Sequence, residues 1–334
     1  MESRCNLERS TAVWKELKFG KRTWKEGRRM EKFARTVLGD IKGEDMGFTY
    51  PHEHLHAVPP PCQKDRDLEL SSYENSVQEL FHFKEVGGRT LVEASTLDYG
   101  RDLKVLKRMA QETGVHIIAT TGFNKHIYYP PWVAETSMEE IAGMLAKDVM
   151  EGGDGSDARA GFIKIGTYYN MIHPLEKKTA IAAATAQKLC NAPIWGHTEA
   201  GTMGMEVLDI LENEGVDLTT VALGHLDRNP DEYYLLKLAD RGIYIQFDGP
   251  GKVKYHPDST RVALIRSLIG HGYGRQLLIS GDMGRASYLE AYGGGPGFRF
   301  IRTKFIARLL DEGISQQDID TIFIENPKRW LAVF

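Results

Sequence analysis

Two histidines near the start of the chain have the type and spacing of metal ligands. They stand in GFTYPHEHLH, residues 47–56, directly after a short β-prone run. His52 and His54 are two residues apart, and on a strand this spacing sends both side chains to one face. Neutral imidazole binds first-row divalent metal ions well, so the pair predicts part of a metal site. We expect Glu53 and His56, beside them, to support the ligands or the fold rather than to react.

Four further residues of ligand type stand in or at the end of later β-prone runs. Lys164 is the only charged residue of GFIKIG, His197 closes PIWGH, His225 closes VALGH and Asp282 closes LLISGD. Taken singly, each has an ordinary explanation, because a strand lysine usually extends to solvent and a GD pair after a strand usually forms a turn. Their recurrence at matching strand ends instead favours one metal centre with four imidazoles and a carboxylate.

Lys164 needs its own account, because an ammonium group cannot bind a cation. Burial pushes a lysine toward its neutral amine. That amine can add carbon dioxide to give a carbamate, an anionic oxygen ligand able to bridge two metal ions held roughly 3.5–4 Å apart. The alternative is a plain ion pair between Lys164 and either Glu93 or Asp282.

Strands and helices alternate along the chain from about residue 37. The periodicity predicts eight strands, at 47–50, 90–94, 116–120, 161–165, 193–196, 220–224, 243–247 and 276–280. It predicts helices between them, including 72–86, 138–150, 175–190, 205–214, 230–241 and 259–270. This pattern favours a (β/α)₈ TIM barrel, of the α/β class, over an open doubly wound sheet. The C-terminal ends of barrel strands surround one active site, so the metal centre is expected there.

Composition and charge limit the partners that this chain could have. Its 334 residues are 42% hydrophobic and 26% charged, with a formal net charge of -4, so we expect no nucleic acid and no anionic membrane as partner. No apolar run approaches the roughly 20 residues of a membrane span. The three cysteines, Cys5, Cys62 and Cys190, are far apart and odd in number, which predicts no disulfide framework and a cytoplasmic location.

The chain divides into a short extension and one large domain. Residues 1–29 are rich in Lys and Arg but lack the apolar core of an export signal, so we expect a poorly ordered extension. Residues 30–334 are expected to form a single (β/α)₈ domain. No glycine-rich phosphate loop of the nucleotide-binding type follows any predicted strand.

The same stretches resemble a known family. GFTYPHEHL, AGFIKIGTYYN, PIWGHTEAGTMG, VALGHLDRNPD, IQFDGPGK and LLISGDMGR occur in the order and at the spacing of the phosphotriesterase-like branch of the amidohydrolase superfamily. The resemblance runs from about Thr36 to Pro327. It implies a metal-dependent hydrolase in which a hydroxide that bridges two divalent ions attacks the substrate. Zinc is the default metal, and manganese, cobalt or iron would fit the same ligands.

The resemblance also assigns a role to each ligand candidate. His52 and His54 would bind the more buried ion, and His197 and His225 the more exposed one. Asp282 would bind the buried ion and accept a proton from the bridging hydroxide. Lys164, as its carbamate, would bridge both ions; some members carry Glu at this position, and the Lys here favours the carbamate.

Basic residues after the last two strands suggest the substrate. Loops in this position often bind phosphate in barrels of this kind, and Arg, Lys and Tyr suit a phosphate monoester. Within the family this pattern looks like the members that hydrolyse phosphorylated sugar lactones. The residues expected to contact phosphate are Lys252, Lys254, Arg285 and Tyr288, and those expected to line the pocket elsewhere are Tyr99, Arg101 and Arg228.

Three hypotheses for function stay open at this point. The first is a lactonase for a sugar lactone, expected to be phosphorylated. The second is a phosphotriesterase or acyl homoserine lactonase with an apolar pocket, and the third is a non-catalytic metal-binding barrel. Whether Lys252, Lys254 and Arg285 face the metal site separates the first two hypotheses. The partner is a small molecule in the first two, and a homodimer is left open.

Overall fold

Eight parallel strands form the central sheet, and they pair in the order in which they occur along the chain. The computed structural model describes residues 31–334, so the expectation for residues 1–29 lies outside the described residues. The strands are β3 Thr49–Glu53, β4 Thr90–Glu93, β5 His116–Gly122, β6 Ala160–Thr167, β7 Ile194–Thr198, β8 Val221–Gly224, β9 Tyr244–Phe247 and β10 Leu277–Ile279. Each coincides with a predicted strand to within three residues, and the predicted (β/α)₈ barrel is confirmed.

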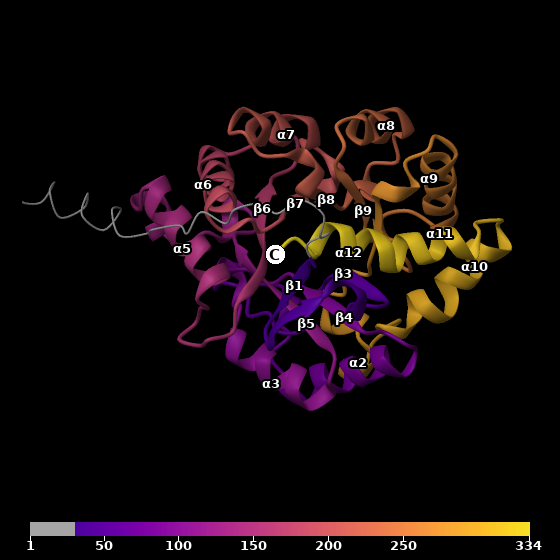
Figure 1. Cartoon of the computed structure of the whole chain (residues 1–334). Helices are drawn as coiled ribbons and strands as arrows, with labels where there is room; N and C mark the ends of the chain where they lie inside the picture. Colours follow the sequence, from indigo (N-terminus) through magenta and orange to yellow (C-terminus); the bar gives the residue numbers. More distant parts are fainter. Residues whose placement is uncertain (1–30) are drawn as a thin grey trace, which may run out of the picture. The chain divides into compact units, whose positions relative to one another are not determined.

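Helices surround these strands (Figure 1). The longer ones are α2 Tyr73–Glu85, α3 Leu103–Thr113, α5 Met138–Met150, α6 Pro174–Cys190, α7 Gly204–Asn213, α8 Glu232–Asp240 and α9 Asp258–Gly270. The short ones are α4 Trp132–Glu135, α10 Ile306–Asp311, α11 Gln316–Asp320 and α12 Asn326–Leu331, with π-helical turns at Ile301–Phe305 and Thr321–Glu325. Within residues 31–334, no helix combines the length and the apolar character needed to cross a bilayer.

Side chains of β6 alternate between two cores. Phe162 lies in the core inside the barrel, whereas Ile163 and Ile165 belong to the core between the strands and the helices. Lys164 comes two residues after Phe162 and therefore points the same way, into the barrel. It is 2% exposed. The strand period thus places a lysine in the interior, near the C-terminal end of β6.

A short hairpin and the last helix close the other end of the barrel. The hairpin strands are β1 Phe33–Thr36 and β2 Gly39–Lys42, which pair antiparallel. Ala34 of β1 and Trp330 of α12 both belong to the interior core, and Ala34 bridges to Ala332. These contacts cover the N-terminal end of the barrel with apolar side chains.

A buried glutamate joins the two ends of the sheet, β3 and β10. The carboxylate of Glu53, at the end of β3, accepts hydrogen bonds from the backbone N–H of Gly281 at 2.6 Å and of Met283 at 2.8 Å. Burial raises the pKa of Glu53 to about 8, although the N–H groups of Met283 and Gly281 work in the opposite direction. Glu53 therefore ties the loop after β10 to β3, which completes the barrel.

We predict that Glu53→Ala lowers the free energy of unfolding by about 3 kcal/mol, because it leaves two buried N–H groups without an acceptor at roughly 1–3 kcal/mol each. Urea denaturation measures the change. Glu44→Ala is the matched control, since Glu44 is exposed in the turn Gly43–Asp45 just before β3. A loss of unfolding free energy below about 1 kcal/mol for Glu53→Ala would contradict the role of Glu53 in joining β3 to the loop after β10.

Candidate active site

One cavity of about 250 Å³ lies at the C-terminal ends of the strands. Its lining includes all six residues predicted to bind metal and six of the seven expected to contact substrate, namely His52, His54, Lys164, His197, His225, Asp282, Tyr99, Arg228, Lys252, Lys254, Arg285 and Tyr288. Arg101 is an exception among the residues named for the pocket walls. Its buried guanidinium binds Asp148 and Asp154 instead, so that expectation was wrong.

Three of these residues converge on the floor of the cavity. The Nε2 atoms of His52 and His54 lie 3.7 and 3.5 Å from Oδ1 of Asp282. The three ligand atoms fall within 4.8 Å of one another, a spacing that a single cation could bridge. Asp282 adopts the left-handed backbone conformation, with φ 45°, and its N–H donates to the carbonyl of His52 at 3.2 Å. Such strained backbone is held by the surrounding structure and is typical of functional sites.

Two other histidines form a second group. Nδ1 of His197 lies 2.9 Å from Nε2 of His225. His225 also has a left-handed backbone, with φ 63°, and its N–H donates to Asp248 at 2.8 Å. Burial lowers the pKa of His197 to about 4, against the opposing effect of Glu199, and holds the pKa of His225 well below its usual value. Both imidazoles are therefore neutral at pH 7, which is the form that binds metal ions.

Lys164 is buried between these two groups and the barrel core. Its Nζ donates to the carbonyl of Ala94 at 2.8 Å and lies 4.9 Å from the centre of the Trp195 ring. Burial lowers the pKa of Lys164 to about 8, although Asp282 and Glu93 favour the charged form. Within residues 31–334, the hydrogen bond of Nζ goes to a carbonyl and neither carboxylate forms a direct ion pair with Lys164, so the two carboxylates act on it only at longer range.

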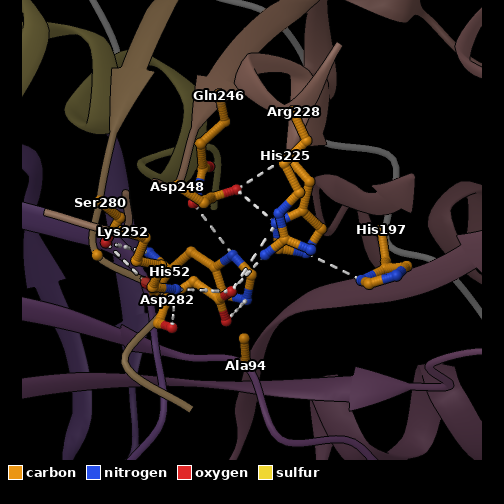
Figure 2. Close-up of polar contacts among 12 residues, drawn as sticks. His52, Ala94, His197, His225, Arg228, Gln246, Asp248, Lys252, Ser280 and Asp282 are labelled. Carbon is orange, nitrogen blue, oxygen red and sulfur yellow. Dashed lines mark hydrogen bonds and ion pairs between the residues drawn. The ribbon is translucent and has the colours of Figure 1, made fainter. Parts of the chain in front are cut away.

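Two cations hold the other carboxylate oxygen of Asp282. Arg228 Nη2 and Lys252 Nζ lie 2.8 and 3.1 Å from Oδ2. Burial opposes ionisation of Asp282, but Lys252 and the neighbouring histidines outweigh it and hold the pKa of Asp282 well below its usual value. Arg228 and Lys252 thus orient the carboxylate so that Oδ1 faces His52, on β3, and His54, directly after it. Figure 2 shows Asp282 beside His52.

The remaining basic residues, Lys254 and Arg285, contact other side chains of the described chain than those of the metal-ligand groups. The ammonium group of Lys254 lies 5.2 Å from the centre of the Tyr288 ring. Arg285 Nη1 donates to Asp65 at 2.7 Å and to Asp67 at 3.1 Å, which fixes the guanidinium at the wall. Lys252, which binds Asp282, lies 5.1 Å from the centre of the same Tyr288 ring, so all four residues predicted to contact phosphate border this one cavity.

The sequence reasoning missed two carboxylates that contact the histidines. Asp248 follows β9 and is 0% exposed, with its oxygens 3.2 and 3.3 Å from Nδ1 of His52 and of His225. Glu199 follows β7, and its Oε2 lies 3.1 Å from Nε2 of His197. Both stand after strands, so the rule that found the other residues could have found these.

The donor set fits divalent cations. Nε2 of His52 is buried and has no hydrogen-bond partner among residues 31–334. Burying a polar atom without a partner is unfavourable, and a cation that binds such an atom removes the penalty. Burial also lowers the pKa of His54 to about 4, so this histidine too presents a neutral ring.

Comparison with known proteins agrees with this geometry. The model of the phosphotriesterase family matches residues 32–331. The chain belongs to the phosphotriesterase family. A phospho-furanose lactonase from Mycoplasmopsis synoviae is 36% identical, with 90% of this chain and 92% of the relative covered. An N-acetyltaurine hydrolase from Danio rerio is 33% identical, with 90% and 97% covered. The crystal structure of a lactonase from Listeria monocytogenes matches with a TM-score of 0.88 and 38% identity, over 90% of this chain and 99% of that one.

We predict that this family member, purified without chelator, holds about two divalent ions per chain, because two separate groups of ligand atoms line the cavity. Inductively coupled plasma mass spectrometry gives the stoichiometry, and dialysis against a chelator followed by zinc and bicarbonate should restore it. One ion or none after that treatment would rule out a two-metal centre.

Proposed function

We propose that this phosphotriesterase-family enzyme is a metal-dependent lactonase that opens a phosphorylated sugar lactone. The observation that carries the proposal is that one cavity combines a floor of metal-ligand types with a basic side made by Lys254, Arg285 and Tyr288. The name of the relative from Mycoplasmopsis synoviae, a phospho-furanose lactonase, and the lactonase structure from Listeria monocytogenes support this substrate class.

The residues that would hold the metal ions are those whose atoms converge on the floor. His52, His54 and Asp282 would hold one ion, and His197 and His225 the other. Lys164, as its carbamate, would lie between them. The donor set suits zinc first, and manganese, cobalt or iron as well. When bound, two such ions supply Lewis acidity toward the lactone carbonyl and acidify the attacking water.

Asp282 is the proposed catalytic base. Its Oδ2 is already held by Arg228 and Lys252, so Oδ1 is the oxygen that faces the reaction centre. Water adds to the lactone carbonyl, the ring C–O bond breaks, and the proton lost by the water passes through Asp282 to the departing alkoxide. The product is an open-chain hydroxy acid that keeps its phosphate.

The phosphate is proposed to lie against Lys254, Arg285 and Tyr288. Charge-assisted hydrogen bonds from ammonium and guanidinium groups suit a phosphate monoester, and the phenol can donate a further bond. Because Asp65 and Asp67 fix Nη1 of Arg285, its guanidinium is oriented before the substrate arrives, which reduces the entropy lost on binding. Tyr99, also in the lining, is proposed to contact the sugar.

A second substrate class competes for the same site. N-acetyltaurine, named for the Danio rerio relative, combines an amide bond with a sulfonate, and a sulfonate could occupy the same basic side. The polar lining argues against apolar triesters and acyl homoserine lactones. A non-catalytic barrel is disfavoured because it would have no use for a lysine and an aspartate buried at the floor.

The surroundings proposed for this enzyme are those of a cytoplasmic protein with a small-molecule substrate. Cys62 and Cys190 are both free thiols, which suits a reducing compartment. We propose neither nucleic acid nor membrane as a partner, and a homodimer remains a proposal that size measurements in solution can test.

We predict that Lys164→Ala lowers metal content and activity together, because it removes the anionic bridge. A short carboxylic acid in the buffer should restore part of both, since it can occupy the vacated space as a replacement oxygen ligand. Metal analysis and lactonase assays on the same samples measure the two effects. Full metal content and full activity in Lys164→Met would exclude the carbamate.

We predict that Lys254→Ala and Arg285→Ala each lower kcat/KM for a phosphorylated aldonolactone by about ten- to a hundredfold, the effect of losing a charge-assisted hydrogen bond worth roughly 1.5–3 kcal/mol. The matching unphosphorylated lactone should be hydrolysed as by the wild type. Lys304→Ala, on the exposed side of Ile301–Phe305, is the control. Equal losses on both lactones would mean a structural role, and wild-type preference for N-acetyltaurine would shift the assignment to amide hydrolysis.

A further inference from the structure

A buried carboxylate lies between two histidines at the cavity floor (Figure 2). Oδ1 of Asp248 is 3.2 Å from Nδ1 of His52, and Oδ2 is 3.3 Å from Nδ1 of His225. Asp248 could in principle bind a cation itself, because its oxygen and one nitrogen of each histidine fall within 4.8 Å of one another. The partners of its two oxygens decide between these roles.

Protein donors account for the acceptor capacity of Asp248. A carboxylate offers about four lone-pair directions. One on Oδ1 accepts from Gln246 Nε2 at 2.6 Å, and one on Oδ2 accepts from the backbone N–H of His225 at 2.8 Å. The other two face Nδ1 of His52 and Nδ1 of His225. If both rings carry their proton on Nδ1, all four directions are filled and none is left for a cation.

The orientation of Gln246 is fixed independently. The indole Nε1 of Trp195 can only donate, and it lies 2.9 Å from Oε1 of Gln246. The amide nitrogen of Gln246 must therefore face Asp248. Gly224 permits this arrangement, because a Cβ added there would lie 1.9 Å from the Trp195 ring. Two donors with fixed orientations thus hold Asp248 in place.

Glu199 contacts the third histidine, His197, at the other ring nitrogen, Nε2. Its Oε2 lies 3.1 Å from Nε2 of His197 and also pairs with the ammonium group of Lys125. A carboxylate at Nε2 favours the ring tautomer with its proton there, which leaves Nδ1 as the free lone pair. That atom is the one that lies 2.9 Å from Nε2 of His225.

We propose that Asp248 and Glu199 are positioning residues that select which nitrogen of each histidine faces the metal ions. Asp248 directs the proton of His52 and of His225 to Nδ1, which leaves both Nε2 atoms for metal. Glu199 directs the proton of His197 to Nε2, which leaves Nδ1. The proposal rests on the two-metal centre proposed above and extends it to residues that only touch its ligands.

The tautomers can be read directly in the zinc-loaded, full-length wild-type protein. Long-range ¹H–¹⁵N correlation spectra distinguish a protonated from a metal-bound ring nitrogen. We expect protonated Nδ1 in His52 and His225, and protonated Nε2 in His197. Protonated Nε2 in His52 or His225 would overturn the role of Asp248, and protonated Nδ1 in His197 would overturn that of Glu199.

Variants test the energetic effect through zinc affinity, measured by competition with a chelating dye. Glu199→Leu should lower the affinity for one of the two zinc ions, the one that His197 would hold, by ten- to a hundredfold. Glu199→Gln should retain most of the affinity, because an amide oxygen can accept the same bond. The control is Glu206→Leu, exposed on α7. Unchanged affinity in Glu199→Leu, or an equal loss in Glu199→Gln, would refute selection through this hydrogen bond.

Asp248→Asn should weaken the binding of the other zinc ion, the one that His52 would hold. The backbone N–H of His225 requires an acceptor, so the Asn oxygen must stay at the Oδ2 position and its NH₂ must face His52. The Asp248→Asn and Glu199→Leu double variant should then retain neither ion tightly. Two tight ions in Asp248→Asn would contradict the proposal, whereas a wild-type protein that binds no zinc would instead refute the metal centre itself.

Discussion

The seam between β3 and β10 is the constraint on which the rest of the site depends. His52 and His54 lie on and just after the first barrel strand, and Asp282 follows the last, so they meet only if the barrel closes. Glu53 makes that closure, because its carboxylate binds two backbone N–H groups of the loop that carries Asp282. Glu53, which lies between the two histidines in the sequence, therefore fixes the distance from His52 and His54 to the carboxylate of Asp282. A barrel closed less firmly would separate the ligand atoms that now lie 3.5 to 3.7 Å apart.

Burial of charged and polar groups at the floor shapes the chemistry that the site can do. Placing a lysine, several histidines and two aspartates inside a barrel is unfavourable unless each finds a partner. The protein supplies partners for the carboxylates, with Arg228 and Lys252 on Asp282. Among the described residues, it leaves Nε2 of His52 without a hydrogen bond, and it gives the ammonium group of Lys164 a carbonyl and an aromatic ring rather than a carboxylate. The histidine nitrogens at the floor therefore lack a cation, and the buried lysine lacks an anionic partner. The proposed metal ions would bind the histidines, and the proposed carbamate would replace the charged amine of Lys164 with an anionic group.

Partner choice separates two kinds of acidic residue around the cavity. In Asp282, one carboxylate oxygen binds two protein cations and the other faces the cavity floor. In Asp248, both carboxylate oxygens accept hydrogen bonds from protein donors. The same distinction applies to the basic residues. Lys252 is bound to Asp282, whereas Lys254 lies over the rings of Tyr255 and Tyr288 and forms no ion pair within residues 31–334, so it is better placed to bind a substrate anion. Membership of the phosphotriesterase family agrees with the metal-ligand residue types at the cavity floor. The proposal that the substrate carries a phosphate rests on Lys254, Arg285 and Tyr288.

Sequence alone determined the barrel and the six candidate ligands, because both follow from local rules. Alternation of short apolar runs with helical periods marks βα units, and residues that end such strands must lie at one end of the barrel. The sequence could not show that Arg101 binds Asp148 and Asp154, that Lys252 binds Asp282, or that Asp248 touches two histidines. Those outcomes depend on side-chain directions and on burial among segments far apart in the chain. Hydrogen-bond partners compete for each buried group, and only the packed structure decides which partner is near enough to bind.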